Sequence, residues 1–335
     1  MMDSEQRTQR KFTILPCAII QIISAAVSAL LVRYNSVYIA ALFVGVAAAM
    51  LCLQILASSS YWYLLSSTLC LCLSFIIGDI AAFALCLFFV PAGIILSVLI
   101  KKKTTKINAV VILNVLYAVL FVILFIALYL LAGNKFSVSA MIEHISSAIN
   151  TLCANVKEAL SETISEYAAR YPNISASDFY AAIDDLFVII KLIIPSLFIV
   201  FCGVVAYITA SVFKLGTSVS KCEILLPDPK WEIVPSFISA IVYIVAYSVY
   251  VIASLFSRGI NVTEIVCQNI MIILQPIMLL MGLKWLFTRR RSGFIIGIFV
   301  FSMIFLMQFA ITVLSFIGVW DIFRRNELKK KQSGK

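Results

Sequence analysis

INAVVILNVLYAVLFVILFIALYLL, residues Ile107–Leu131, decides the fold class of this chain. The stretch carries no charged side chain over its 25 residues, and four lysines lie just before it, at positions 101–103 and 106. A helix of about 20 apolar residues spans the hydrocarbon core of a bilayer. The segment therefore predicts a transmembrane helix that begins at a basic membrane surface.

Comparable runs recur along the whole chain, which is 63% hydrophobic and 13% charged with a mean hydropathy of +1.07. Soluble domains are about 25% charged. This composition excludes a soluble enzyme, a disordered tail, a disulfide scaffold and a nucleic-acid-binding domain. It predicts an all-α, polytopic bundle of about eight to ten transmembrane helices in a lipid bilayer.

The expected spans follow from the apolar runs and from the polar breaks between them. A break at Gly78-Asp79 divides one long run into two spans. The final run is one span, a hairpin of two short, tilted helices, or a re-entrant element. The predicted spans are Thr13–Val32, Val37–Ala57, two within Leu64–Ile100, Ile107–Leu131, Leu186–Phe213, Phe237–Phe256, Val262–Phe287 and Phe294–Trp320.

One segment, residues 133–185, is polar and acidic, and its apolar residues recur at helical spacing from Met141 to Ile164. This pattern predicts an amphipathic helix. A second helix is expected to start near Ser175–Asp178 and to run directly into the sixth span. The resulting division is an N-terminal membrane bundle (1–132), an amphipathic segment (133–185), a C-terminal membrane bundle (186–323) and a basic tail (324–335).

The net charge of +10 is concentrated at the ends of apolar runs. Cytoplasmic loops are enriched in Lys and Arg. We therefore expect the N-terminus, the cluster at 101–106 and the arginines at 289–291 to lie in the cytoplasm, with the amphipathic segment outside. Lys191, near the outer end of the sixth span, is expected to extend to the membrane surface or to pair with Asp184 or Asp185.

Motifs for catalysis are missing from the sequence. There is no GxSxG, HExxH or phosphate-binding loop, and nine cysteines accompany a single histidine, His144. Cys70 and Cys72 are spaced too closely for a CxxC site. We therefore expect a protein that is not an enzyme, with no catalytic residue, no metal site and no cofactor.

The eighth span carries the densest set of polar side chains within an apolar run. Glu264, Gln268 and Gln275 lie within about 40° of one line at 100° per residue. Asn269 is adjacent, and Pro276 is expected to bend the helix. We call Glu264, Gln268, Asn269 and Gln275 the polar stripe. It predicts either a small-molecule pocket or amides that hold helices together. Gln21, Gln54 and Gln308 are interpreted as isolated structural amides.

Several motifs in the second half resemble the YybS-like family of bacterial multi-span membrane proteins. They are Leu226-Pro227 with Trp231 and Pro235, then Gln275 through Gly282 before Arg289–Arg291, and Gly318-Val319-Trp320-Asp321 before Arg324-Arg325. The resemblance implies a bacterial cytoplasmic (inner) membrane and no known activity. Such proteins are distantly similar to the substrate-binding subunits of energy-coupling-factor transporters.

Two functions follow as expectations. In the first, the protein binds or transports a small solute at the polar stripe, and a separate partner supplies energy, because no nucleotide-binding loop is present. The alternative is a non-catalytic scaffold or interaction protein with envelope or signalling functions, docking a partner through the amphipathic segment or the basic tail.

Overall fold

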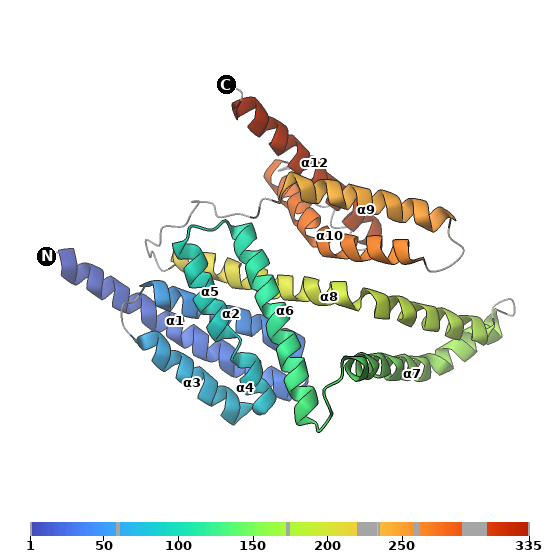
Figure 1. The fold of residues 1–335 in the computed structure, drawn as a ribbon, viewed down its shortest axis with the longest axis horizontal. Coiled ribbons are helices and arrows are strands. Elements are labelled where there is room, and N and C mark those ends of the chain that lie inside the picture. The colour runs from blue at the N-terminus through green and yellow to red at the C-terminus, as the bar shows by residue number, and fades with distance from the viewer. Residues whose placement is uncertain are drawn as a thin grey trace. The chain divides into compact units, whose positions relative to one another are not determined.

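The structure is a computed structural model. It describes residues 2–57, 61–171, 175–219, 233, 235–256, 261–289 and 307–333. The regular structure in this part of the chain is α-helical (Figure 1). Seven described segments are long and apolar enough to cross a membrane, and one of them, Ile80–Lys101, contains two consecutive helices. The expected all-α, multi-pass architecture is confirmed.

Helix boundaries agree closely with the predicted spans. The helices of the first half are α1 (Met2–Arg33), α2 (Val37–Ala57), α3 (Trp62–Ile77), α4 (Ile80–Cys86), α5 (Phe89–Lys101), α6 (Lys106–Leu131) and α7 (Val138–Arg170). The second half adds α8 (Ala176–Val219), α9 (Phe237–Phe256), α10 (Val262–Arg289) and α12 (Met307–Ser333).

The break predicted at Gly78-Asp79 separates α3 from α4. One carboxylate oxygen of Asp79 accepts hydrogen bonds from the backbone N–H groups of Ala81 and Ala82, both at 2.9 Å. The first N–H groups of a helix lack partners within the helix. Asp79 is therefore the N-cap of α4, a role that explains a carboxylate between two apolar helices.

Replacing Asp79 with alanine should lower the free energy of unfolding by about 1 kcal/mol, since the two N–H groups lose their acceptor. Denaturant titration of the purified protein in detergent measures this change. Asp79→Asn retains an acceptor oxygen and serves as the control. Equal losses for the two variants would contradict the capping role.

The second part of the Leu64–Ile100 run is divided again, at Leu87-Phe88, which the sequence analysis did not predict. Pro91 has no N–H to donate to the carbonyl of Leu87, so that carbonyl accepts from Val90 instead, at 3.2 Å. Proline disrupts the helix at the residues that precede it. The predicted fourth span is therefore two consecutive helices, α4 and α5.

Helix α8 is one unbroken element of 44 residues. This confirms that a helix starting near Ser175 continues into the sixth span, and it extends six residues past the predicted end at Phe213. Ser175 and Asp178 exchange hydrogen bonds, with the Asp178 N–H donating to the Ser175 hydroxyl and the Ser175 N–H to the Asp178 carboxylate. This reciprocal pair is a capping box, which fixes the start of α8.

The last apolar run is described only from Met307 onward. From there α12 continues without a break past Trp320 and Arg324, as far as Ser333. The segment 290–306, where a second short helix of a hairpin was expected, lies outside the described residues, as does the connector at 220–232. Helix-favouring Leu, Glu and Lys residues after Arg325 explain why the basic end is helical.

The chain folds into two compact units, Met1–Leu128 with Ile199–Pro235, and Tyr129–Phe198 with Ser236–Lys335. Both are discontinuous in sequence, because α6 and α8 each contribute residues to both. The predicted division at residues 132, 185 and 323 follows membrane sidedness instead and stays a prediction.

Small residues hold the helices of the first unit together. In α2, Ala40, Ala47 and Ala48 are fully buried. An added Cβ at Gly93 of α5 would lie 2.9 Å from the carbonyl oxygen of Ala48. Small residues allow membrane helices to approach closely, so that van der Waals contact replaces the missing hydrophobic effect.

The second unit has a core formed by α9, α10 and α12. Its buried members are Ala240, Tyr243, Met278, Met281, Val319 and Ile322. Aromatic rings extend it, with Phe316 packed edge-on against Tyr247 at 5.0 Å between ring centres. This core positions α10, the helix of the polar stripe.

Candidate functional site

The four residues of the polar stripe lie on α10, and each is half-buried. The four residues differ in their hydrogen-bond partners. Asn269 contacts α8, within the second unit, whereas Gln268 and Gln275 form no hydrogen bond with the residues that the structure describes. Glu264 lies in the first turn of α10.

Asn269 joins α10 to α8 through both ends of its amide. Its Nδ2 donates to the carbonyl oxygens of Leu192, at 3.2 Å, and of Ile265, at 2.8 Å. Its Oδ1 accepts from the hydroxyl of Ser196, which is 2% exposed. An amide whose polar atoms are all occupied in this way is structural, as one of the two interpretations of the stripe predicted.

Pro195 follows the turn of α8 that receives this side chain. Proline lacks an N–H and crowds the carbonyls of the preceding turn, so the helix loosens beside it. Asn269 donates to the carbonyl of Leu192 in that turn. The carbonyl that Pro195 itself leaves without a helical donor is that of Lys191, four residues earlier, so the Asn269 contact lies in the same turn, one residue further along.

Gln268 and Gln275 therefore remain as the available polar groups of the stripe. They are seven residues apart on α10, about two helical turns, and Gln275 directly precedes Pro276. Each amide offers two donors and one acceptor. An amide left without a partner in the hydrocarbon region costs several kcal/mol.

A buried polar cluster in the first unit was missed by the sequence analysis. Gln21 of α1 and Gln54 of α2 are each 0% exposed, and Ser66 and Ser67 of α3 are also buried. The Gln54 Nε2 donates to the Gln21 Oε1 at 2.6 Å, and the Gln21 Nε2 donates to the Ser67 hydroxyl at 3.3 Å. The Ser66 hydroxyl lies 2.8 Å from the Gln54 Oε1.

The interpretation of Gln21 and Gln54 as isolated amides is therefore wrong. The available signal was one amide in each of the first two spans and a Ser-Ser pair in the third. Whether these side chains meet depends on the rotation of each helix about its axis. The sequence does not reveal that rotation, because the residues around them are apolar on all sides of the helix. The cluster is compact and mutually hydrogen-bonded, so it is typical of a structural connection between α1, α2 and α3.

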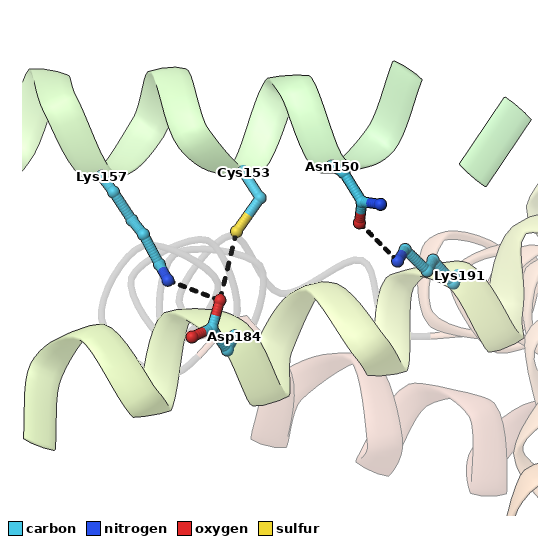
Figure 2. Close-up of polar contacts among 5 residues, drawn as sticks. All are labelled: Asn150, Cys153, Lys157, Asp184 and Lys191. Carbon is cyan, nitrogen blue, oxygen red and sulfur yellow. Dashed lines mark hydrogen bonds and ion pairs between the residues drawn. The ribbon is translucent and has the colours of Figure 1, made fainter. Parts of the chain in front are cut away.

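A third polar region joins α7 to the N-terminal part of α8, as Figure 2 shows. The Lys157 ammonium lies 2.5 Å from an Asp184 carboxylate oxygen, and the Lys191 ammonium donates to the Asn150 side-chain oxygen at 2.6 Å. On each helix the two positions are seven residues apart, in opposite chain directions. The two contacts therefore form rungs of an antiparallel helical hairpin.

The predicted pairing of Lys191 with Asp184 or Asp185 is wrong. Residues seven apart on one helix lie on the same face but two turns from each other, about 10 Å along the axis. Asp184 instead accepts from Lys157, which raises the pKa of that lysine, and from the buried Cys153 thiol at 3.7 Å. Cys153 is thus part of the contact between α7 and α8.

Comparison with known protein families assigns the chain to one of them. The family model for a predicted membrane protein (DUF2232) matches residues 21–322, most of the chain. The chain belongs to this family. No curated protein and no solved structure gave a match. The DUF2232 match begins at Gln21 and ends at Ile322, so it contains the buried polar cluster, the polar stripe and the motifs at Gly282 and Gly318.

Those two glycines of the DUF2232 region lie against each other where α10 crosses α12. A Cβ at Gly282 would lie 2.0 Å from the Leu314 carbonyl oxygen, and one at Gly318 would lie 1.9 Å from the Met278 carbonyl oxygen. Asp321, one turn further along α12, is 5% exposed and accepts from the Arg325 Nε at 2.7 Å. Two motifs 36 residues apart in sequence thus form one helix crossing.

Metal chemistry has no evident location in the described part of this DUF2232 protein. Within it, no group of three or more His, Cys, Asp or Glu side chains is arranged to hold a metal ion. The only histidine, His144, packs its ring against Tyr129 at 5.7 Å between centres. Gln268 and Gln275 of the polar stripe remain the candidate site.

Proposed function

We propose that the protein is a non-enzymatic protein of the bacterial cytoplasmic membrane that binds a small polar solute at Gln268 and Gln275 of α10. Two amides on one membrane-spanning helix without hydrogen bonds to the described residues carry this proposal. Polar groups at membrane depth are usually turned toward a partner or a cavity. A solute with several hydrogen-bonding groups is a suitable partner for them.

The neighbouring residues support the assignment of roles. Asn269 is occupied by α8, so it holds the helix in place, and Pro276 lies one residue after Gln275. Glu264, at the start of α10, provides a carboxylate near the outer membrane surface. Gln268 and Gln275 then provide the hydrogen bonds that select an uncharged polar group of the solute.

Thermal stabilisation by candidate solutes tests the proposal. We expect one compound from a panel of water-soluble vitamins and amino acids to stabilise the purified protein, by about 2.7 kcal/mol at a hundred times its Kd. The variant Gln268→Leu/Gln275→Leu should lose this stabilisation, because leucine keeps the volume and removes the amides. Stabilisation that persists in the double variant would exclude these residues as the site.

The control is Asn269→Leu, which removes the contact with α8. It should lower the melting temperature of the protein without solute, while Gln268→Leu/Gln275→Leu should leave that temperature nearly unchanged. The opposite result, a large loss of basal stability in the glutamine variant, would assign the glutamines to helix packing.

Transport would need a second protein. The sequence has no phosphate-binding loop, so a separate ATPase would supply the energy. Energy-coupling-factor transporters, to which YybS-like proteins are distantly similar, work in this way. This part of the proposal predicts that the protein co-purifies with an ATPase subunit from native membranes.

The second candidate function is a membrane scaffold that docks a partner through α7. Large apolar side chains on α7 remain solvent-exposed, among them Ile142 and Leu152, at 63% and 55%. Exposed apolar side chains grouped along one helix mark an interaction surface. Docking through α7 is compatible with solute binding at α10, because the two surfaces share no residue.

A further inference from the structure

Within the second unit, the contact between α7 and α8 leaves one apolar line of α7 uncovered. We call this line the α7 seam. It repeats every three or four residues and consists of Ile142, Ile145, Ile149, Leu152, Val156 and Leu160. Ile142, Ile145, Leu152 and Leu160 are exposed, and Ile149 and Val156 are half-buried. At 100° per residue the seam covers about 80° of the helix circumference.

The seam is distinct from the face that packs on α8. The contacts with α8 come from Asn150, Cys153 and Lys157. These three positions are centred about 90° around the helix from the seam. The hairpin with α8 can therefore stay intact while the seam contacts something else.

The identities along the seam favour a pair of identical helices. In heptad notation Ile142, Ile149 and Val156 occupy a positions, and Ile145 and Leu152 occupy d positions. Isoleucine or valine at a with leucine at d favours parallel, two-stranded coiled coils. The central pair, Ile149 and Leu152, has this pattern, whereas the first d position is Ile145 and the third is Ala159. One helix with this pattern supplies both halves of the knobs-into-holes packing.

The charges of α7 agree with self-pairing and disfavour a membrane surface. Ser146, Ala148 and Asn155, which flank the seam, are uncharged, and the flanking Lys157 is paired with Asp184 of its own chain. Glu143, Glu158 and Glu162 lie at least about 120° from the centre of the seam. Helices that rest on anionic lipid carry Lys and Arg on the polar face, whereas the polar face of α7 is acidic.

We propose that α7 pairs through the seam with α7 of a second copy of this chain, as a short parallel coiled coil outside the membrane-spanning segments. This proposal rests on the second candidate function and names its partner. The seam covers less than three heptads, which is marginal for free helices. Two copies confined to one membrane have a raised effective concentration, which compensates for the short contact.

Disulfide trapping in native membranes tests the pairing directly. In a background with the nine native cysteines replaced, Leu152→Cys places a thiol at a d position, and Ala154→Cys places one on the opposite side of α7. Copper phenanthroline is the oxidant that converts two facing thiols to a disulfide. We expect a covalent dimer from Leu152→Cys and at most a trace from Ala154→Cys. Equal yields from the two variants would overturn the proposal.

A second measurement keeps all native cysteines and does not need the trapping background. Ile142→Asp/Leu152→Asp adds two carboxylates to the seam, and Ser147→Asp/Ala154→Asp adds two to the opposite face. The seam variant should weaken dimerisation more than about a hundredfold, and the control variant should match the unmodified protein. Mass photometry of the detergent-solubilised protein over a concentration series measures both.

The remaining outcomes separate this proposal from docking in general. A monomer that captures a different protein through the seam would overturn self-pairing and retain the scaffold function. A Leu152→Cys variant that gives no covalent dimer, together with a seam that captures no other protein, would overturn both. Neither result affects solute binding at Gln268 and Gln275, which the thermal-shift experiment tests by itself.

Discussion

Replacing Gly318 with alanine is expected to destabilise the second unit, although alanine normally favours a helix over glycine by about 1 kcal/mol. The added methyl group would lie 1.9 Å from the Met278 carbonyl oxygen, a backbone atom that cannot rotate away. The reciprocal contact at Gly282, 2.0 Å from the Leu314 carbonyl oxygen, prevents α12 from shifting along α10. The two helices must therefore separate.

Separation exposes the core around Met278, Met281 and Val319, and overpacking alone costs about 1–3 kcal/mol. We expect a loss of more than about 3 kcal/mol for Gly318→Ala, because strain and lost packing add. Unfolding in a detergent–denaturant series, followed by the tryptophan fluorescence of the purified protein, measures the change. Gly282→Ala should behave in the same way.

Gly203 on α8 provides the matched control for this prediction. A Cβ there would lie 3.4 Å from the Asn114 side-chain nitrogen, which is an ordinary contact. Gly203→Ala should therefore leave stability unchanged or raise it by up to about 1 kcal/mol. Changes of the same sign and size at both glycines would contradict the close crossing of α10 and α12.

Replacing Gln21 with leucine is expected to have the second largest effect. Gln21 accepts from the Gln54 Nε2 at 2.6 Å and donates to the Ser67 hydroxyl. Without Gln21 the Gln54 amide loses its acceptor while it is 0% exposed. An unsatisfied buried donor costs about 1–3 kcal/mol, so Gln21→Leu should lower the free energy of unfolding by that amount.

The double variant Gln21→Leu/Gln54→Leu separates a polar network from simple packing. Replacing both partners by apolar groups of similar shape removes the unsatisfied atoms, so part of the stability should return. A double-mutant cycle measures this coupling, which we expect to be about 1 kcal/mol in a membrane environment. Additive losses would show that the two glutamines act independently.

The stripe on α10 shows how far residue patterns alone can be taken. Helical periodicity placed Gln268 and Gln275 within about 20° of each other, and the helix Val262–Arg289 agrees with the predicted span. Periodicity could not distinguish Asn269, which binds α8, from the two glutamines. That distinction depends on which neighbour faces each side of α10, including the turn beside Pro195.

The sequence by itself determined the all-α membrane class and most helix boundaries, including Phe237–Phe256 to the residue. Insertion in lipid requires long uncharged runs, and such runs are visible in the order of residues. Only the tertiary structure joined Gln21 to Gln54, Lys157 to Asp184 and Gly282 to Gly318. These contacts depend on the rotation and depth of each helix. Because these helices are apolar on nearly all sides, the order of residues does not reveal which side faces a neighbouring helix.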